Sequence, residues 1–135
     1  KGRETGKVII VSELDGAGER TKGYQSTADA LQAHEDLDAI FAINDPSALG
    51  AYTAVKEANR QDRIKIIGFD GQLDGKQAIK DGWIFADPIQ HPDQMGREIV
   101  KLIVKYQAGE DFDQEILIPA TLYDKAEADK DPELK

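Results

Sequence analysis

The chain contains no cysteine and only two histidines, His34 and His91. Without cysteine it has no disulfide, no thiolate nucleophile and no sulfur ligand for a metal. The two histidines lie far apart in the sequence and lack the short spacing of a metal-binding pair, so we expect no metal site. The absence of cysteine is compatible with an exported bacterial protein.

Basic residues and long apolar runs are also scarce. Lysine and arginine number 17 against 26 acidic residues, which gives a formal net charge of −9. This charge disfavours binding to a phosphate backbone, so we expect no nucleic-acid partner. No apolar run approaches the roughly 20 residues of a membrane span, and the polar start KGRETGKVII contains no signal peptide. The length of 135 residues predicts one domain, residues 1–135.

Short apolar runs alternate with amphipathic stretches along the chain. The predicted strands are residues 7–12, 37–43, 64–69, 83–86, 116–118 and 121–123. The predicted helices are residues 19–34, 46–58, 74–80 and 92–107. This alternation favours an α/β fold with a doubly wound parallel sheet and helices on both faces. Residues 124–135 form a charged tail that we expect to be frayed.

Polar side chains stand where the predicted strands end. In a doubly wound sheet, ligands bind outside the carboxyl ends of the strands. Amide, carboxylate and guanidinium groups there suit a neutral polyhydroxylated ligand, because each hydroxyl both donates and accepts a hydrogen bond. The residues at these positions are Arg20, Asn44, Asp45, Asp70, Asp87 and Gln90.

The same region lacks the patterns that catalysis requires. The glycines at 16, 18, 68 and 71 form neither a dinucleotide-binding motif nor a phosphate-binding loop. No Ser-His-acid set can be selected from the spacing. We therefore expect no catalytic residue, no cofactor and no enzymatic activity.

Structural roles compete for several of these residues. Asn44 fits a helix cap as well as a ligand contact, and Asp45 fits a cap better than a contact. Asp70 is equally compatible with a simple turn, and Arg20 with a solvated helix position. Trp83 opens a predicted strand, which favours packing over stacking against a sugar.

Three stretches resemble the periplasmic ribose-binding proteins, the sugar-binding proteins of ABC transporters, whose fold is shared by the effector domain of LacI-type repressors. They are DAIFAINDPSALGAYTAVKEA, IKIIGFDGQLDGKQAIKDG and DPIQHPDQMGREIVKLI, with GERTKGYQ as a further match. The likeness runs from about residue 7 to residue 123. The order of IND…ALGA, GFDG and IQHPDQMG is specific, whereas each piece alone is weak.

The resemblance implies a non-catalytic function. A ribose-like monosaccharide would bind between two lobes that close on a hinge, and a membrane permease would recognise the closed form. The parent protein would be exported to the periplasm. By the same resemblance, Arg20, Asn44, Asp70 and Gln90 contact the sugar hydroxyls from the second lobe. Asp87 is a possible further contact, at a position where the family more often has a small or hydroxyl residue.

Two departures from the family pattern affect this expectation. Only the second lobe is represented, the first lobe is absent, and residues 1–6 read as mid-chain sequence. A strand of the family is missing near residues 25–26, so the chain is either part of a longer sequence or an engineered or degenerate half. In the strand order 2-1-3-4-5 the missing strand is the edge, and we expect its loss to expose the edge of residues 7–12.

Two alternatives remain open at this point. The chain fits the effector-sensing domain of a LacI-type regulator, which an upstream helix-turn-helix in place of a signal peptide would distinguish. It also fits a phospho-acceptor or enzyme on a flavodoxin-like sheet, with Asp70 or Asp45 reactive. Against the second alternative, no lysine directly follows residues 116–118.

Overall fold

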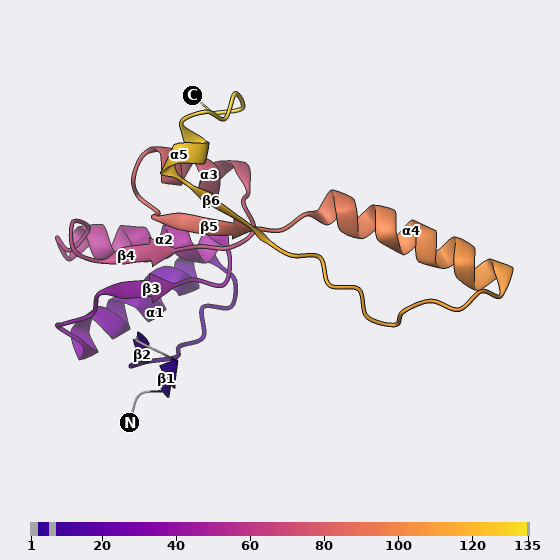
Figure 1. Ribbon diagram of the computed structural model, residues 1–135. Coiled ribbons are helices and arrows are strands. Elements are labelled where there is room, and N and C mark those ends of the chain that lie inside the picture. The colour runs from indigo at the N-terminus through magenta and orange to yellow at the C-terminus, as the bar shows by residue number, and fades with distance from the viewer. Residues whose placement is uncertain (1–2, 6–7, 135) are drawn as a thin grey trace.

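A four-stranded, mainly parallel sheet forms the centre of the computed structural model, which describes residues 3–5 and 8–134 (Figure 1). The strand order is β3-β4-β5-β6, with bounds β3 (Ala39–Phe41), β4 (Lys65–Ile67), β5 (Ala86–Ile89) and β6 (Thr121–Asp124). The first three strands are parallel, and β6 is antiparallel to β5. The predicted α/β class with a mainly parallel sheet flanked by helices is confirmed.

The four long helices lie close to their predicted positions. They are α1 (Arg20–Ala33), α2 (Asp45–Glu57), α3 (Leu73–Lys80) and α4 (Pro92–Ala108). Local signals explain this agreement, since both α2 and α4 have a proline in the first turn, and α4 ends at Gly109 in a left-handed conformation.

The core lies between the sheet and helices α2 and α3. Its largest fully buried apolar side chains are Val55 of α2, Ile66 of β4, Ile79 of α3 and Ile84 before β5. Burial of each such side chain contributes roughly 1.5–3 kcal/mol relative to exposure. This core fixes the carboxyl ends of the parallel strands, where the candidate ligand contacts lie.

The prediction that residues 7–12 form a strand of the main parallel sheet is wrong. Residues 8–12 contain β2 (Val8–Ile10), which pairs antiparallel with β1 (Arg3–Thr5) in a separate two-stranded sheet; position 7 lies outside the described residues. Val8 and Ile9 are each 61% exposed, so this run is not a buried parallel strand. A β-branched run predicts an extended chain, but without alternation it specifies neither its partner nor its register.

The open edge of the main sheet therefore belongs to β3. Among the described strands, β3 pairs with β4 on one side and has no partner on the other. The expectation that residues 7–12 would provide the exposed edge is wrong for this reason. Phe41 on this strand is 66% exposed, and Ile43 just after it is 68% exposed.

The fourth predicted strand is displaced toward the C-terminus. It runs over Ala86–Ile89 and contains Pro88, whose carbonyl accepts a hydrogen bond from the Asp70 N–H at 3.2 Å. The predicted segment 83–86 overlaps this strand only at Ala86. A proline argues against a strand when only the sequence is considered, so the extent of β5 past Pro88 is not visible in the sequence. Trp83 stacks on Tyr52 with ring centroids 5.1 Å apart, which confirms the packing role. Residues 116–118 form no strand.

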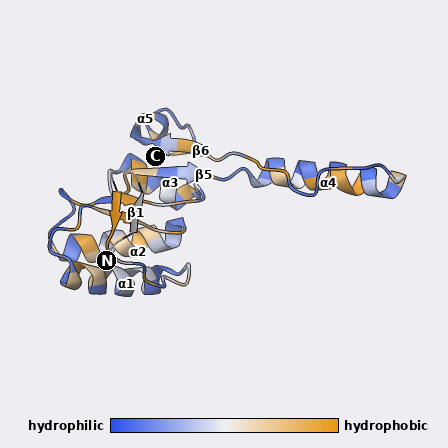
Figure 2. Ribbon diagram, turned by 60° about the horizontal axis from the view of Figure 1, so that its bottom comes forward, coloured by the Kyte–Doolittle hydropathy of each residue, from blue (hydrophilic) through white to orange (hydrophobic). Residues whose placement is uncertain are grey.

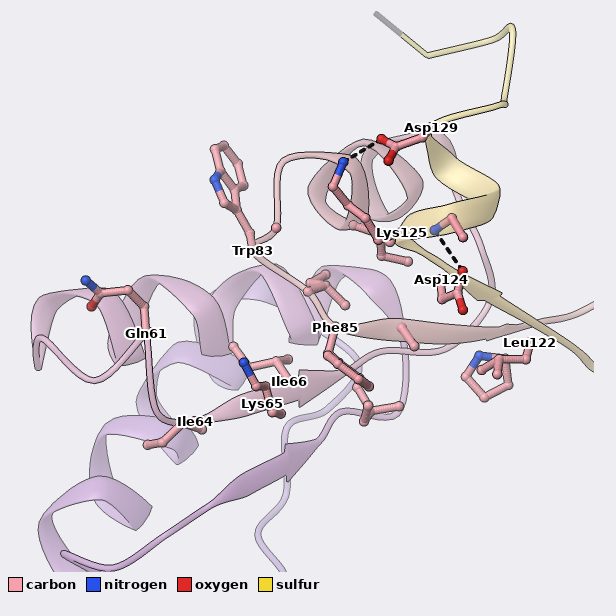
Figure 3. A pocket seen from close by; sticks show the side chains of 17 residues that line it. Gln61, Ile64, Lys65, Ile66, Trp83, Phe85, Leu122, Asp124, Lys125 and Asp129 are labelled. Carbon is pink, nitrogen blue, oxygen red and sulfur yellow. Dashed lines mark hydrogen bonds and ion pairs between the residues drawn. The ribbon is translucent and has the colours of Figure 1, made fainter.

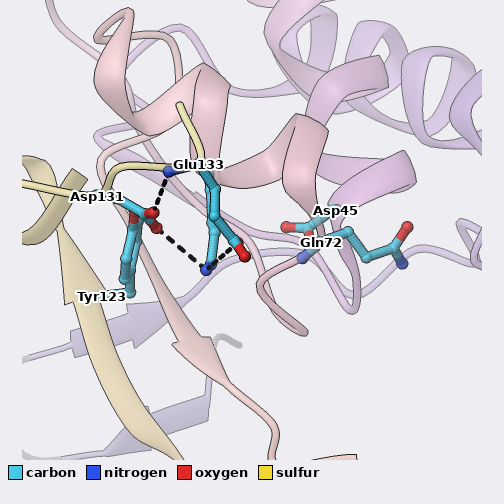
Figure 4. Close-up of polar contacts among 6 residues, drawn as sticks. Asp45, Gln72, Tyr123, Asp131 and Glu133 are labelled. Atoms are coloured by element: carbon cyan, nitrogen blue, oxygen red, sulfur yellow. Dashed lines mark hydrogen bonds and ion pairs between the residues drawn. The ribbon is translucent and has the colours of Figure 1, made fainter. Parts of the chain in front are cut away.

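The charged tail is folded where fraying was expected. Helix α5 (Lys125–Ala128) follows β6 directly, and Ala128 is fully buried. The Tyr123 hydroxyl donates to Asp131 at 2.8 Å, and Lys76 of α3 forms an ion pair with the same carboxylate at 3.2 Å (Figure 4). These contacts attach the tail to α3.

Helix α4 projects away from the rest of the molecule (Figures 1 and 2). None of its residues is buried, and the apolar side chains Ile99, Val100, Ile103 and Val104 are all at least half exposed. Across residues 3–5 and 8–134, no helix combines the length and apolarity needed to cross a bilayer.

Candidate ligand-binding site

Three parallel strands bring candidate residues to one edge of the sheet. Asn44 follows β3, Asp70 follows β4 and Gln90 follows β5. Because β3, β4 and β5 are parallel neighbours, their carboxyl ends share this edge. We call the four residues Arg20, Asn44, Asp70 and Gln90 the rim.

Asp70 and Gln90 form one half of the rim. The Gln90 amide donates to Asp70 Oδ1 at 2.5 Å, and the backbone N–H of Gln90 donates to the Asp70 carbonyl at 3.2 Å. Asp70 has φ 104°, in the left-handed region that favours glycine, and is followed by Gly71 at φ 79°. Asp70 also forms a parallel bridge with Ile89, so it continues the strand pairing and is not a simple turn residue, and its carboxylate is held in a fixed position.

Asn44 and Arg20 form the other half. Asn44 Oδ1 accepts from the Ser47 N–H at 3.0 Å and caps α2, while its Nδ2 donates to the Gly18 carbonyl at 2.9 Å. The second bond holds the chain just before α1, whose first residue is the exposed Arg20. Within the described part of the chain, no hydrogen bond joins this half directly to Asp70 or Gln90.

The expected cap role of Asp45 is wrong. Asn44 caps α2, while the fully buried Asp45 accepts from the Gln72 N–H at 2.6 Å with Oδ2 (Figure 4). Gln72 is the N-cap residue that directly precedes α3. A Cβ at Gly75 of α3 would lie 2.6 Å from Asp45 Oδ2, so the glycine makes room for this carboxyl. Asp45 thus connects α2 to α3 beneath the rim.

The possible ligand contact at Asp87 is not supported by the geometry. Its side chain is fully buried and lies beside Gly68, on the inner side of β5. A ligand at the surface of the rim cannot reach a carboxyl without exposed surface. The alternation of a strand explains the difference, because Asp87 and Gln90 are three residues apart and project to opposite sides.

Gln72 is a further rim neighbour that the sequence reasoning did not select. Its amide lies 3.5 Å from Asp70 Oδ2, and its side chain is exposed. The sequence places Gln72 at the same strand end as Asp70, two residues further on, and this position is the signal for its role.

A hollow of about 630 Å³ runs along β4, β5 and β6 (Figure 3). It is lined by Lys65 at the start of β4, by Trp83 and Phe85 before β5, and by Asp124 at the end of the antiparallel β6. None of the rim residues lines it. We therefore do not assign it to the ligand.

Comparison with known proteins identifies the family. Residues 2–111 match the model of the periplasmic binding protein domain. The chain belongs to the periplasmic binding protein family. Its members bind solutes and are not enzymes, which confirms the expected absence of catalysis.

Curated members of the family are similar over much of this chain. The ribose import binding protein RbsB of Salmonella typhimurium is 44% identical over 92 residues, 68% of this chain and 31% of the relative. The D-ribose/D-allose-binding protein of Pseudomonas aeruginosa is 35% identical over 101 residues, 75% of this chain and 32% of the relative. The chain thus spans about a third of the length of these relatives.

Solved structures of periplasmic binding proteins share the fold. The glucose-galactose binding protein GanP from Geobacillus stearothermophilus has a TM-score of 0.82 at 25% identity, covering 87% of this chain and 42% of that one. An ABC transporter periplasmic solute binding protein from Actinobacillus succinogenes with bound D-allose has a TM-score of 0.81, covering 90% and 43%. At 23% identity the second likeness concerns the fold alone.

Proposed function

We propose that this periplasmic binding protein chain is the second lobe of the sugar-binding component of an ABC importer, with ribose or a related monosaccharide as ligand. The carrying observation is the Asp70 carboxylate, fixed by Gln90 at the carboxyl edge of the parallel sheet. The similarity to ribose import binding proteins supports the choice of sugar.

The rim offers hydrogen bonds that match sugar hydroxyls. The Asp70 carboxylate accepts from two hydroxyls, and the Arg20 guanidinium donates without accepting. Asn44 retains one N–H of its amide after its bond to Gly18. Hydrogen bonds to the charged groups are the stronger ones, so Asp70 and Arg20 would contribute most of the affinity.

The proposed ligand site also requires the first lobe, which this chain does not contain. The chain spans about a third of its curated relatives, and α4 presents an apolar side with no buried residue (Figure 2). We place the first lobe against α4, with the sugar enclosed between the lobes. Sugar would favour the closed form because both lobes contact it there, and a membrane permease in the same import system would recognise that form in the periplasm.

Calorimetry on the full-length protein that carries this lobe tests the proposal. Ribose, allose and glucose are titrated separately, and small-angle scattering is measured with and without each sugar. We expect at least one sugar to bind in the micromolar range or tighter and to reduce the radius of gyration. If none of these sugars produces heat or compaction, the proposed function is wrong.

A further inference from the structure

Two buried carboxyl groups lie together behind the rim. Asp45 belongs to the first turn of α2 and Asp87 to β5, and both side chains are fully buried. Both face Gly68, which follows β4. A Cβ at Gly68 would lie 3.2 Å from Asp45 Oδ1 and still closer to Asp87 Oδ1, so only glycine leaves room for the pair.

If both groups are carboxylates, most of their oxygens lack a hydrogen-bond donor. Asp45 Oδ2 accepts from the Gln72 N–H, but Asp45 Oδ1 and both oxygens of Asp87 are buried without a partner. Two adjacent carboxylates removed from water repel each other and lose their hydration. One proton resolves both problems, because a neutral carboxyl group donates a hydrogen bond to the remaining carboxylate.

The surroundings indicate which group holds the proton. Burial and the neighbouring Asp45 carboxyl together raise the pKa of Asp87 to about 8, although the Gly68 backbone N–H acts to lower it. Burial also raises the pKa of Asp45, but bonds from Asp87 and the Gln72 N–H act to lower it. The other charges acting on the pair are negative, Asp70 after β4 and, for Asp45, Asp74 of α3. Asp87 is therefore the neutral member.

A metal ion is a poorer explanation than a proton. Among the residues that the structure describes, no group of three or more histidine, aspartate or glutamate side chains is placed to hold a metal. The pair also lies against the backbone of Gly68, which leaves little space for an ion and its remaining ligands.

We propose that Asp45 and Asp87 share one buried proton that links α2 to β5, so that this lobe is more stable at mildly acidic than at mildly alkaline pH. The linked elements carry both halves of the rim, since Asn44 precedes Asp45 and Gln90 follows β5. The proposal concerns folding and does not depend on which ligand the protein binds.

The direction of the pH effect follows from proton linkage. The pKa of Asp87 in the folded lobe lies above its value of about 3.9 in an unfolded chain. Between these two values the folded state binds more protons than the unfolded state. Stability is therefore complete below the unfolded pKa and is lost as the pH rises through the folded pKa near 8.

Urea unfolding of the 135-residue chain between pH 6 and pH 9 tests the proposal, with circular dichroism as the readout. The equilibrium constant for folding should fall by about tenfold or more over this range. In Asp87→Asn, whose amide donates to Asp45 without titrating, this dependence should disappear. The matched control Asp62→Asn, in an exposed turn, should retain the wild-type dependence.

Carbon-13 NMR of the aspartate carboxyls in the unmodified chain gives a test that does not rely on a variant that folds. One aspartate should remain protonated above pH 6 and titrate several pH units later than the others. The proposal is overturned if every aspartate titrates below pH 5, if Asp87→Asn keeps the wild-type pH dependence, or if calcium stabilises the chain and EDTA reverses that effect.

Discussion

Asp70 combines an unfavourable backbone conformation with a fixed carboxylate. A non-glycine residue at φ 104° costs roughly 1–3 kcal/mol, and such strain persists only where the surroundings enforce it. Here the enforcing contacts are the parallel bridge between Asp70 and Ile89 and the amide of Gln90. The side chain is thus ordered before a ligand arrives, which reduces the entropy lost on binding.

Replacing Asp70 by Asn in the full-length protein should weaken ribose binding by about 10- to 100-fold, because a hydrogen bond to a charged group is worth roughly 1.5–3 kcal/mol. Asparagine tolerates a positive φ better than most residues, so the backbone conformation at this position should be retained. Isothermal calorimetry measures the change, and Asp62→Asn serves as the exposed control. An unchanged dissociation constant in Asp70→Asn would remove Asp70 from the site.

Single residues differ in how far the sequence predicts them. Asn44, Asp70 and Gln90 could be placed at one edge because strand ends are visible as transitions from apolar to polar residues. The role of Asp45 could not, because a residue before proline at a helix start resembles a cap, whereas its partner Gln72 is 27 residues away. The buried pairing with Asp87 depends on how the start of α2 and β5 meet at Gly68, which no local pattern encodes.

Helices α1 and α2 pack together through two glycines. A Cβ at Gly23 of α1 would lie 2.7 Å from the Ser47 carbonyl oxygen, and one at Gly50 of α2 would lie 2.8 Å from the Tyr24 nitrogen. Both contacts are with backbone atoms, which cannot turn aside as a flexible side chain can. The helices can therefore approach this closely only because glycine has no Cβ at these two positions.

The variant Gly50→Ala should destabilise the chain by about 1–3 kcal/mol, since overpacking forces the backbones apart. Urea denaturation measures the change in the free energy of unfolding. Gly96→Ala in α4 is the matched control, because a Cβ there meets nothing within 4 Å. That control should be neutral or slightly stabilising, since alanine favours a helix over glycine. Equal stability of both variants would show that α1 and α2 can separate without cost.

Helix α5 is held by side chains that are far apart in the sequence. Tyr123 is 8% exposed, and its hydroxyl donates to Asp131, which also pairs with Lys76 of α3 (Figure 4). Burial and the neighbouring Asp131 carboxylate raise the pKa of Tyr123, so the hydroxyl remains a donor at neutral pH.

Removal of this hydroxyl in Tyr123→Phe should loosen the tail while leaving the sheet intact. A hydrogen bond to a charged acceptor is worth roughly 1.5–3 kcal/mol, and the apolar ring keeps most of its packing. Hydrogen exchange should accelerate over residues 125–134 and stay constant in β4 and β5. Tyr106→Phe on the exposed face of α4 is the control. Unchanged exchange in the tail would contradict the proposed attachment.

Helices and strands, like single residues, are predicted best where the signals that mark them are local. Helices α2 and α4 were predicted closely because caps and prolines mark their boundaries locally. The order of the tail was not, because it depends on contacts such as Lys76–Asp131, which join residues 55 positions apart. The partner of β2 lies only a few residues away, but a β-branched run without alternation does not specify its pairing. A charged segment appears unstructured in the sequence when its partners are distant.

At the scale of the whole molecule, three features leave apolar surface uncovered. The apolar side of α4 has no buried residue, the outer edge of β3 has no strand partner among the described residues, and β2 is exposed. An unpaired, apolar strand edge is a template for pairing with another chain. The 135-residue chain should therefore associate with itself when the proposed first lobe is absent.

The same exposure should make this chain a weak sugar binder on its own. One lobe presents the rim to water, so each sugar hydroxyl exchanges a bond to water for a bond to protein with little net gain. Binding sites gain affinity by enclosing most of the ligand surface, which a single lobe cannot do. We therefore expect millimolar or weaker ribose affinity by calorimetry, together with concentration-dependent light scattering. A lysine on the open edge, in Phe41→Lys, should reduce the scattering without improving the affinity. Micromolar ribose affinity in a clean monomer would mean that this lobe is sufficient by itself and that enclosure between two lobes is the wrong mechanism.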